Sequence, residues 1–353
     1  MRKTIIFCIL ALLCAVPACA AELSVPGLDR VWEEAEGYGV SEDSSLDEGL
    51  SNLFDRALEQ AGGLFRAGLA TAARLAAVVL LCSLAQSVGE SGEGGLQAVS
   101  IAGALSITAL TMTDMAVMIG MGRDTLGKME GFSGLLLPVM SVLTAATGGI
   151  TGAAVRQGAT VLFSQLLITA MDRLLIPLVY AYVAASCAYA AVGNPGLKRT
   201  AGLLKGTITF VLTALLLAFV GYLTASGAIA GSVDAAAVKA AKLAISRAIP
   251  VVGGILADAS ESVLAGAGAL RGTVGAAGLL VVLAICLTPF LRLALQYLLY
   301  KGTAALCATV AQPRLAALID DIGAAFGLVL GMTGAGALVL LVSLVSAVAA
   351  VAP

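Results

Sequence analysis

The chain has 353 residues, a formal net charge of −2 and a hydrophobic share of 59%, which together exclude most classes of soluble protein. Charged residues make up only 12% of the chain, whereas a soluble domain carries about 25%. We therefore expect an all-α polytopic membrane protein, a transmembrane helical bundle held in the lipid membrane.

Residues 1–20 predict a signal peptide. Arg2 and Lys3 form a basic start, Ile5–Val16 is apolar, and Ala18-Cys19-Ala20 fits an A-x-A cleavage site. The apolar stretch is shorter than the ~20 residues that a membrane span needs. An uncleaved first span and a lipoprotein signal are the alternatives.

An acidic extracytoplasmic arm is expected over 21–66. Residues 22–66 hold eleven acidic residues and three arginines, half of all the acidic residues in the chain. This charge disfavours contact with nucleic acid or anionic lipid. The arm is expected to be solvated and to turn helical towards its end.

Apolar blocks predict seven or eight spans, in a first block over 67–231 and a C-terminal block over 276–353. The blocks are 67–88, 96–120, 132–150, 157–171, 174–192, 204–230, 276–299 and 323–350. The segment 157–171 is short, and could be half of a broken span. Lys198, Arg199 and Lys205 predict a cytoplasmic loop, and eight spans then place the N-terminus outside, as a signal peptide requires.

Residue types needed for common enzyme chemistry are missing from the sequence. The chain has no histidine and no GxxxxGK[ST] phosphate-binding loop. Its cysteines are scattered without a CxxC pair, so neither a disulfide framework nor a metal site is indicated. We expect a protein that is not an enzyme and has no cofactor, no metal and no catalytic residue.

Three charged residues lie inside predicted spans: Arg74, Asp114 and Arg292. Such charges are costly in a bilayer, so each is expected to face protein or water. They are candidates for a polar pathway, with a possible Arg74–Asp114 pair. The alternative is that the arginines snorkel to the interface and Asp114 is satisfied by Thr111 or Thr113.

A glycine repeat marks the last predicted span. Gly323, Gly327 and Gly331 form GxxxGxxxG on one helix face, where backbones can approach closely. We expect helix packing at this face, within the chain or between copies.

The half-polar segment 232–275 predicts a pair of amphipathic extracytoplasmic helices. Pro250 ends the first helix and Gly253-Gly254 makes the turn. The second helix carries Asp258 and Glu261 opposite an apolar face. We expect Pro250, Gly253, Asp258 and Glu261 to belong to an interaction surface.

This segment and the next span resemble the stage III sporulation protein AE family. The matching features extend from the amphipathic pair to the end of that span. They are Pro250-Val251-Val252-Gly253, Asp258-Ala259, Leu270, Val274-Gly275, Gly278, Pro289 and Tyr300-Lys301. The layout of signal peptide, charged arm and multispan bundle also agrees, although the arm is short for the family.

The resemblance implies a multi-pass protein of the mother-cell membrane around the forespore, required for endospore formation. It would be part of a transenvelope channel or secretion complex with other stage III A proteins, including a separate ATPase and ring-forming subunits. That complex would meet the forespore protein stage II Q. The rival hypothesis is a self-sufficient secondary transporter of a small solute, with Arg74, Asp114 and Arg292 along its path.

Overall fold

The computed structural model describes residues 46–88, 93–146, 162–225, 273–310 and 313–351, together with Glu33 and Glu36. The predicted signal peptide and most of the predicted amphipathic pair lie outside these residues. So do four residues of the predicted interaction surface: Pro250, Gly253, Asp258 and Glu261.

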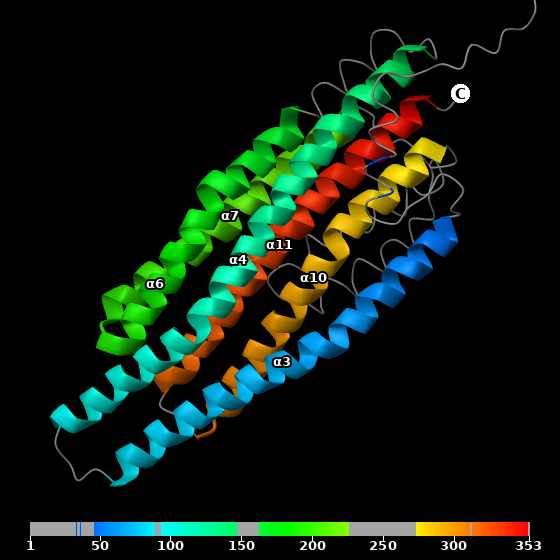
Figure 1. Ribbon diagram of the computed structural model, residues 1–353. Helices are drawn as coiled ribbons and strands as arrows, with labels where there is room; N and C mark the ends of the chain where they lie inside the picture. The colour runs from blue at the N-terminus through cyan, green and yellow to red at the C-terminus, as the bar shows by residue number, and fades with distance from the viewer. Residues whose placement is uncertain are drawn as a thin grey trace, which may run out of the picture.

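Long helices form an elongated bundle, and the described residues contain no strand (Figure 1). This confirms the all-α class. The elements are α3 (Leu46–Val88), α4 (Glu93–Ala146), the π-helical turn η1 (Met171–Leu175), α6 (Ile176–Val192), α7 (Pro195–Ala225), α10 (Thr273–Cys307) and α11 (Pro313–Val351). Within the described ranges, six helices are long and apolar enough to cross a membrane: α3, α4, Leu162–Val192, α7, α10 and α11.

The helices differ from the seven or eight predicted spans because two pairs of blocks are joined. The block 96–120 and the described part of the block 132–150 lie in the single helix α4, and the described part of 157–171 lies with 174–192 in Leu162–Val192. Charged residues interrupt the apolar pattern at both junctions without ending the helix. Arg123 at the first junction forms an ion pair with Asp172 at the second, so each of these two charges is neutralised by a charge on the neighbouring helix.

The π-helical turn η1 follows from a proline. Pro177 has no backbone N–H, and in a regular helix its ring would clash with the carbonyl of Arg173. The N–H of Ile176 instead bonds to the carbonyl of Met171, five residues earlier. The wider turn keeps the helix continuous past the proline.

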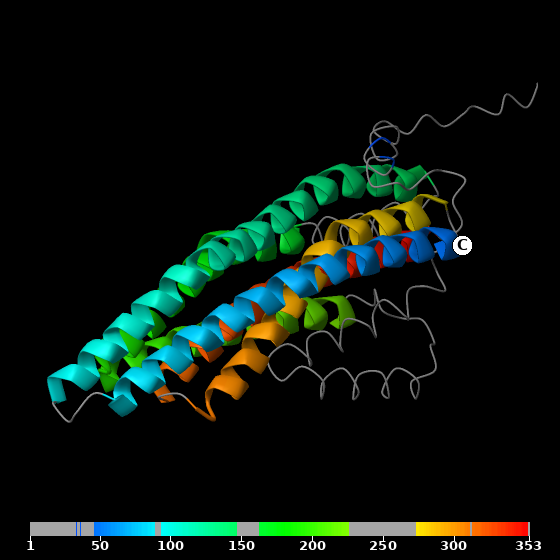
Figure 2. The same ribbon diagram turned by 60° about the horizontal axis from the view of Figure 1, so that its bottom comes forward.

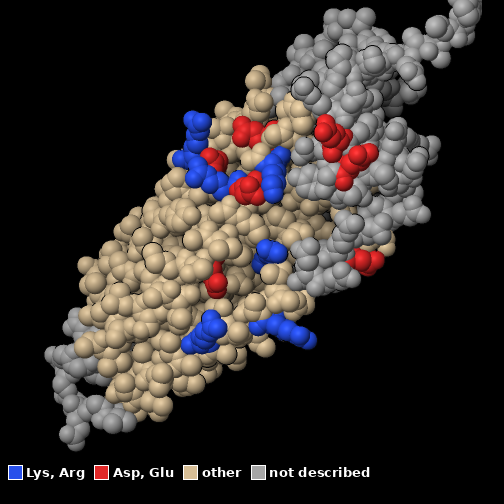
Figure 3. All heavy atoms as spheres, in the orientation of Figure 1, with Lys and Arg blue, Asp and Glu red and all other residues tan. Residues whose placement is uncertain are grey.

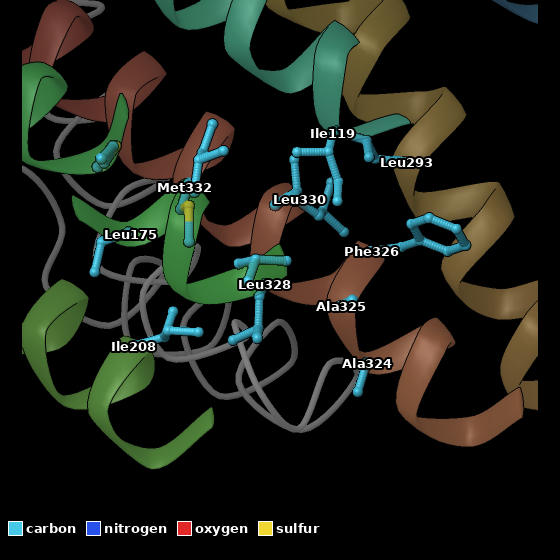
Figure 4. Close-up of a cluster of buried hydrophobic side chains, with 14 of the residues drawn as sticks. Ile119, Leu175, Ile208, Leu293, Ala324, Ala325, Phe326, Leu328, Leu330 and Met332 are labelled. Atoms are coloured by element: carbon cyan, nitrogen blue, oxygen red, sulfur yellow. The ribbon is translucent and has the colours of Figure 1, made fainter. Parts of the chain in front are cut away.

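Helix α11 lies at the centre of the bundle. It contacts α10, α4, α6 and α7. In the most apolar stretch of α11, 89% of the residues are buried, whereas in that of α3 only 17% are buried. In Figure 1, α3 lies along α10 and α6 along α7, with α4 and α11 between the two pairs. Figure 2 shows α4 as a long curved helix along one face. Figure 4 shows the core, where Phe326, Leu328 and Leu330 of α11 lie among residues from neighbouring helices.

Three helix turns lie at the same end of the bundle, opposite the start of α3 and the end of α11 (Figure 1). They join α3 to α4, α6 to α7, and α10 to α11. The hydroxyl of Ser83 in α3 donates to the carbonyl of Val310 in the α10–α11 turn, at 2.9 Å. This bond ties α3 to the turn and fixes the relative level of the helices.

The α6–α7 turn is specified by its residues. Gly193 ends α6 in the left-handed region at φ 76°, and its N–H bonds to the carbonyl of Tyr189 at 2.7 Å. The side chain of Asn194 then accepts from the N–H of Gly196 at 2.8 Å, and Pro195 is the first residue of α7. The guanidinium of Arg314 fills the space beside Gly193.

Candidate functional site

Asp114 of α4 is held by two neutral donors from α10. The hydroxyl of Tyr300 donates to its carboxylate at 2.9 Å, and the side-chain amide of Gln296 donates to the same oxygen at 3.2 Å. These two residues lie one helical turn apart on the same face of α10. Asp114 is therefore satisfied by the facing helix, while the hydroxyl of Thr111 bonds to the carbonyl of Ile107 in its own helix.

Two further polar pairs continue from Tyr300 across the bundle. The ammonium of Lys301 in α10 pairs with Asp320 of α11 at 2.7 Å. The hydroxyl of Tyr182 in α6 donates to Asp321 at 2.9 Å. We call this group the polar cluster; its residues are Asp114, Tyr182, Gln296, Tyr300, Lys301, Asp320 and Asp321.

The polar cluster is continuous because neighbouring residues on one helix face different helices. Successive helical residues are about 100° apart, so Asp320 faces α10 while Asp321 faces α6. Asp321 is eight residues into α11, and Tyr182 is ten residues from the end of α6. At about 1.5 Å per residue, the members of the cluster on α6, α10 and α11 lie roughly 10–16 Å from the α6–α7 and α10–α11 turns. These residues therefore lie within the candidate membrane-spanning parts of their helices.

Glycines of α11 let α10 come close at this level. A side chain at Gly323 would lie 3.0 Å from Cβ of Tyr300, and one at Gly327 would lie 3.0 Å from the ring of Tyr297. Tyr300 also packs edge-on against Phe326, with ring centroids 5.0 Å apart. The glycine face of α11 therefore packs within the chain at Gly323 and Gly327. Gly331, the third glycine of the repeat, is buried.

Neither of the two intramembrane arginines forms an ion pair with the polar cluster in the described residues, although Arg292 lies one helical turn before Gln296 on the same face of α10. Arg74 of α3 is exposed, and no ion pair joins it to Asp114 in the described part of the chain. The Nε atom of Arg292 in α10 is buried and has no hydrogen-bond partner among the described residues. Among the described residues, Asp114 is thus bonded to Gln296 and Tyr300 of α10 and to neither arginine.

The sequence pattern missed most of the polar cluster because helices α10 and α11 extend further than their apolar blocks. Lys301, Asp320 and Asp321 fell between the predicted spans 276–299 and 323–350, although α10 continues to Cys307 and α11 begins at Pro313. A proline at the first position of a helix is a start signal that could have placed this boundary. The partners Tyr182 and Gln296 carry no such local signal.

The chemistry open to the polar cluster is proton exchange or hydrogen bonding. It offers three carboxylates, one ammonium and two phenolic hydroxyls. Across the ranges that the structure describes, no group of histidine, cysteine and acidic residues could hold a metal ion. The cysteines Cys82, Cys187, Cys286 and Cys307 are free thiols.

A second set of charges lies further along the bundle, where α4 meets η1. Both nitrogens of the Arg123 fork contact the carboxylate of Asp172, and Asp124 pairs with Lys128 at 2.9 Å. Figure 3 shows charged side chains gathered over this part of the bundle, on a surface that is otherwise mostly uncharged. Asp172 is 20 residues before Val192, about 30 Å along the helix.

The sequence of the chain matches a known protein family. The family model for stage III sporulation protein AE matches residues 41–351, which is most of the chain. The chain belongs to the stage III sporulation protein AE family. Membership confirms the resemblance to this family that the sequence indicated. It associates the chain with sporulation.

A curated relative supports the same family. The chain is 24% identical over 197 residues to stage III sporulation protein AE of Bacillus subtilis (strain 168). The alignment covers 56% of this chain and 49% of the relative, so the chain spans about half the length of the relative it matches. No solved structure matches the chain.

Proposed function

We propose that this chain is a multispan membrane component of the mother-cell/forespore transenvelope channel or secretion complex required for endospore formation. The observation that carries the proposal is the family match over residues 41–351, which ties almost the whole bundle to a sporulation family. The six apolar helices support a multi-pass place in a membrane. In this proposal the membrane is that of the mother cell around the forespore.

The helices are long enough for the protein to extend beyond its own membrane. Helix α4 has 54 residues and is about 81 Å long, whereas the hydrocarbon core of a bilayer is about 30 Å thick. Helix α11, with 39 residues, is also longer than one span requires. The excess length would carry the end opposite the three turns out of the lipid, towards other components in the intermembrane space.

The partners in this proposal are other stage III A proteins, including a separate ATPase and ring-forming subunits, and indirectly the forespore protein stage II Q. The chain itself is not an enzyme in this proposal, and the separate ATPase supplies the energy. A signal peptide over 1–20 would place the following arm outside. The segment 232–275 would provide the docking surface, with Asp258 and Glu261 on its exposed face.

Deletion and complementation in a sporulating host test this role. We expect the deletion strain to arrest after engulfment and the wild-type chain to restore spores and co-purify with the other stage III A proteins. The variant with Asp258→Lys and Glu261→Lys should insert normally but lose the co-purifying partners. The matched control, Asp124→Lys, changes charge on the bundle and should keep them. Normal sporulation of the deletion strain would refute the proposal.

The polar cluster keeps the transporter alternative open, since buried charges in a membrane bundle often line a solute path. In that case the purified chain alone would move a small solute across a liposome membrane. In the proposed role it would not. The same preparation, with and without the other stage III A proteins, separates the two functions.

A further inference from the structure

Basic side chains from two helices meet where the α6–α7 turn lies beside the start of α11. The guanidinium of Arg314 lies against Gly193, and a Cβ added at Gly193 would be 2.9 Å from its Nη2 atom. The ammonium of Lys198 in α7 lies 5.6 Å from the centre of the Tyr189 ring. Tyr189 is in the last turn of α6 and Gly193 ends that helix, so the two residues are one turn apart. Two cations from different helices therefore converge on the same helix end.

These cations have no carboxylate partner in the part of the chain that the structure describes. None of the ion pairs found there includes Lys198, Arg199 or Arg314. The neighbouring sequence supplies no acid either, because the stretches 189–205 and 308–319 contain neither Asp nor Glu. Like charges that lie close together repel one another, and an anion placed between them removes the repulsion. The arrangement therefore favours an anion that comes from outside the chain.

Exposed apolar side chains border the basic ones on α7. Leu203 lies one helical turn after Arg199 and is 72% exposed, and Phe210, two turns further along the same face, is 73% exposed. Gly206 lies between these two side chains and has nothing within 4 Å of the position where a Cβ would begin. All of these residues belong to the candidate span Pro195–Phe219. This surface thus offers cations at the helix start and an open apolar face directly beyond them, which suits a phospholipid.

The level of the cations along the helices also suits a lipid headgroup. Lys198 is the fourth residue of α7 and Arg314 is the second residue of α11. On α7, the 20 residues 206–225 that follow the last basic residue carry no charge. At about 1.5 Å per residue they extend about 30 Å, which is the thickness of the hydrocarbon core of a bilayer. With this apolar length in the hydrocarbon, the cations lie at the level of the phosphates.

We propose that Lys198, Arg199 and Arg314 bind the phosphate of an anionic phospholipid at the α6–α7 turn, with an acyl chain along Leu203 and Phe210. The arginine forks can each give two hydrogen bonds to phosphate oxygens, and the lysine adds a point charge. A zwitterionic lipid carries its own cation in the headgroup and neutralises the three side chains less well. The site does not depend on the sporulation role.

Native mass spectrometry of the full chain in detergent tests the site, with phosphatidylglycerol and phosphatidylcholine of the same acyl chains as probes. The wild-type chain should bind phosphatidylglycerol more tightly. Lys198→Gln with Arg314→Gln should weaken that binding about thirtyfold and leave phosphatidylcholine unchanged, since each basic residue near a lipid headgroup contributes about fivefold. The matched control is Arg123→Gln with Lys128→Gln. It removes two cations that have carboxylate partners and should keep the preference.

A single variant keeps the test independent of the packing between Arg314 and Gly193. Arg199→Gln, on the exposed surface of α7, should weaken phosphatidylglycerol binding about fivefold without changing the unfolding temperature in detergent. Equal binding of the two lipids by the wild-type chain would overturn the proposal. So would an unchanged preference in both Arg199→Gln and the double variant.

Competition separates a lipid from other anions. Inorganic phosphate and polyglutamate, each added at the concentration of the lipid, should not displace phosphatidylglycerol, because neither covers the apolar face of α7. Displacement by phosphate would assign the cations to a free anion, and displacement by polyglutamate would assign them to an acidic protein segment. Either result would show that the occupant is not a lipid.

Discussion

At the scale of single residues, glycines decide where helices end and how closely they approach. Gly193 has the positive φ that ends α6, and Arg314 lies against it. Gly122 of α4 faces Val329 of α11 in the same close manner. Exposed glycines such as Gly202 have nothing within 4 Å of the position where a side chain would begin. The same residue type is therefore essential at one position and replaceable at another.

Gly193→Ala is expected to destabilise the protein. The left-handed conformation costs a residue with a side chain about 1–2 kcal/mol, and the new Cβ would also displace the Arg314 guanidinium. Unfolding in detergent should show a loss of at least that size. Gly202→Ala, in the middle of α7, is the control and should be neutral or stabilising by up to about 1 kcal/mol. Equal effects at the two positions would contradict this assignment.

At the scale of elements, the glycines of α11 determine how closely α10 packs against it. Gly327→Leu should separate these helices, because the leucine would occupy the place of the Tyr297 ring. We expect a loss of about 1–3 kcal/mol in unfolding free energy, the usual cost of overpacking. Gly302→Leu on the open side of α10 is the matched control. A stable Gly327→Leu protein would mean that the glycine face is not needed for packing within the chain.

The pair Arg123–Asp172 joins α4 to the π-helical turn, and its side chains are 62% and 29% exposed. Reversing either charge alone should cost up to about 1 kcal/mol, as for other exposed pairs. Exchanging the two, Arg123→Asp with Asp172→Arg, should recover most of that loss. The measurement is a double-mutant cycle in thermal unfolding. Additive effects of the two single variants would show that the pair contributes no coupling.

The extent to which sequence could predict these elements depends on whether the deciding contact is local. Apolar length and the residues Gly193, Asn194 and Pro195 specify helices and a turn from neighbouring residues alone. The junctions inside α4 and Leu162–Val192 could not be predicted, because Arg123 is satisfied by a residue 49 positions away. Asp114 stood out as a rare charge, yet its partners on α10 are more than 180 positions away.

At the scale of the whole molecule, the continuous helices preserve the predicted orientation of both ends. Joining two pairs of predicted spans removes two crossings, so the parity of the bundle is unchanged. The three turns share one end, and the basic residues Lys198, Arg199 and Arg314 lie at or near it. The positive-inside rule predicts that this end is cytoplasmic. The two ends of the chain are therefore predicted on the same side of the membrane with six spans as with eight.

The segment between α4 and Leu162 separates the two topologies. With eight spans, residues 151–156 would be cytoplasmic. With α4 continuous, its last residue and Leu162 both lie away from the turn end, so the segment that joins them is expected outside. We predict that Arg156→Cys, in a chain with its other cysteines replaced, reacts with a membrane-impermeant thiol reagent added from the outer face. Asn194→Cys in the α6–α7 turn should react only after the membrane is opened, and if Arg156→Cys shares that behaviour, α4 does not cross as one span.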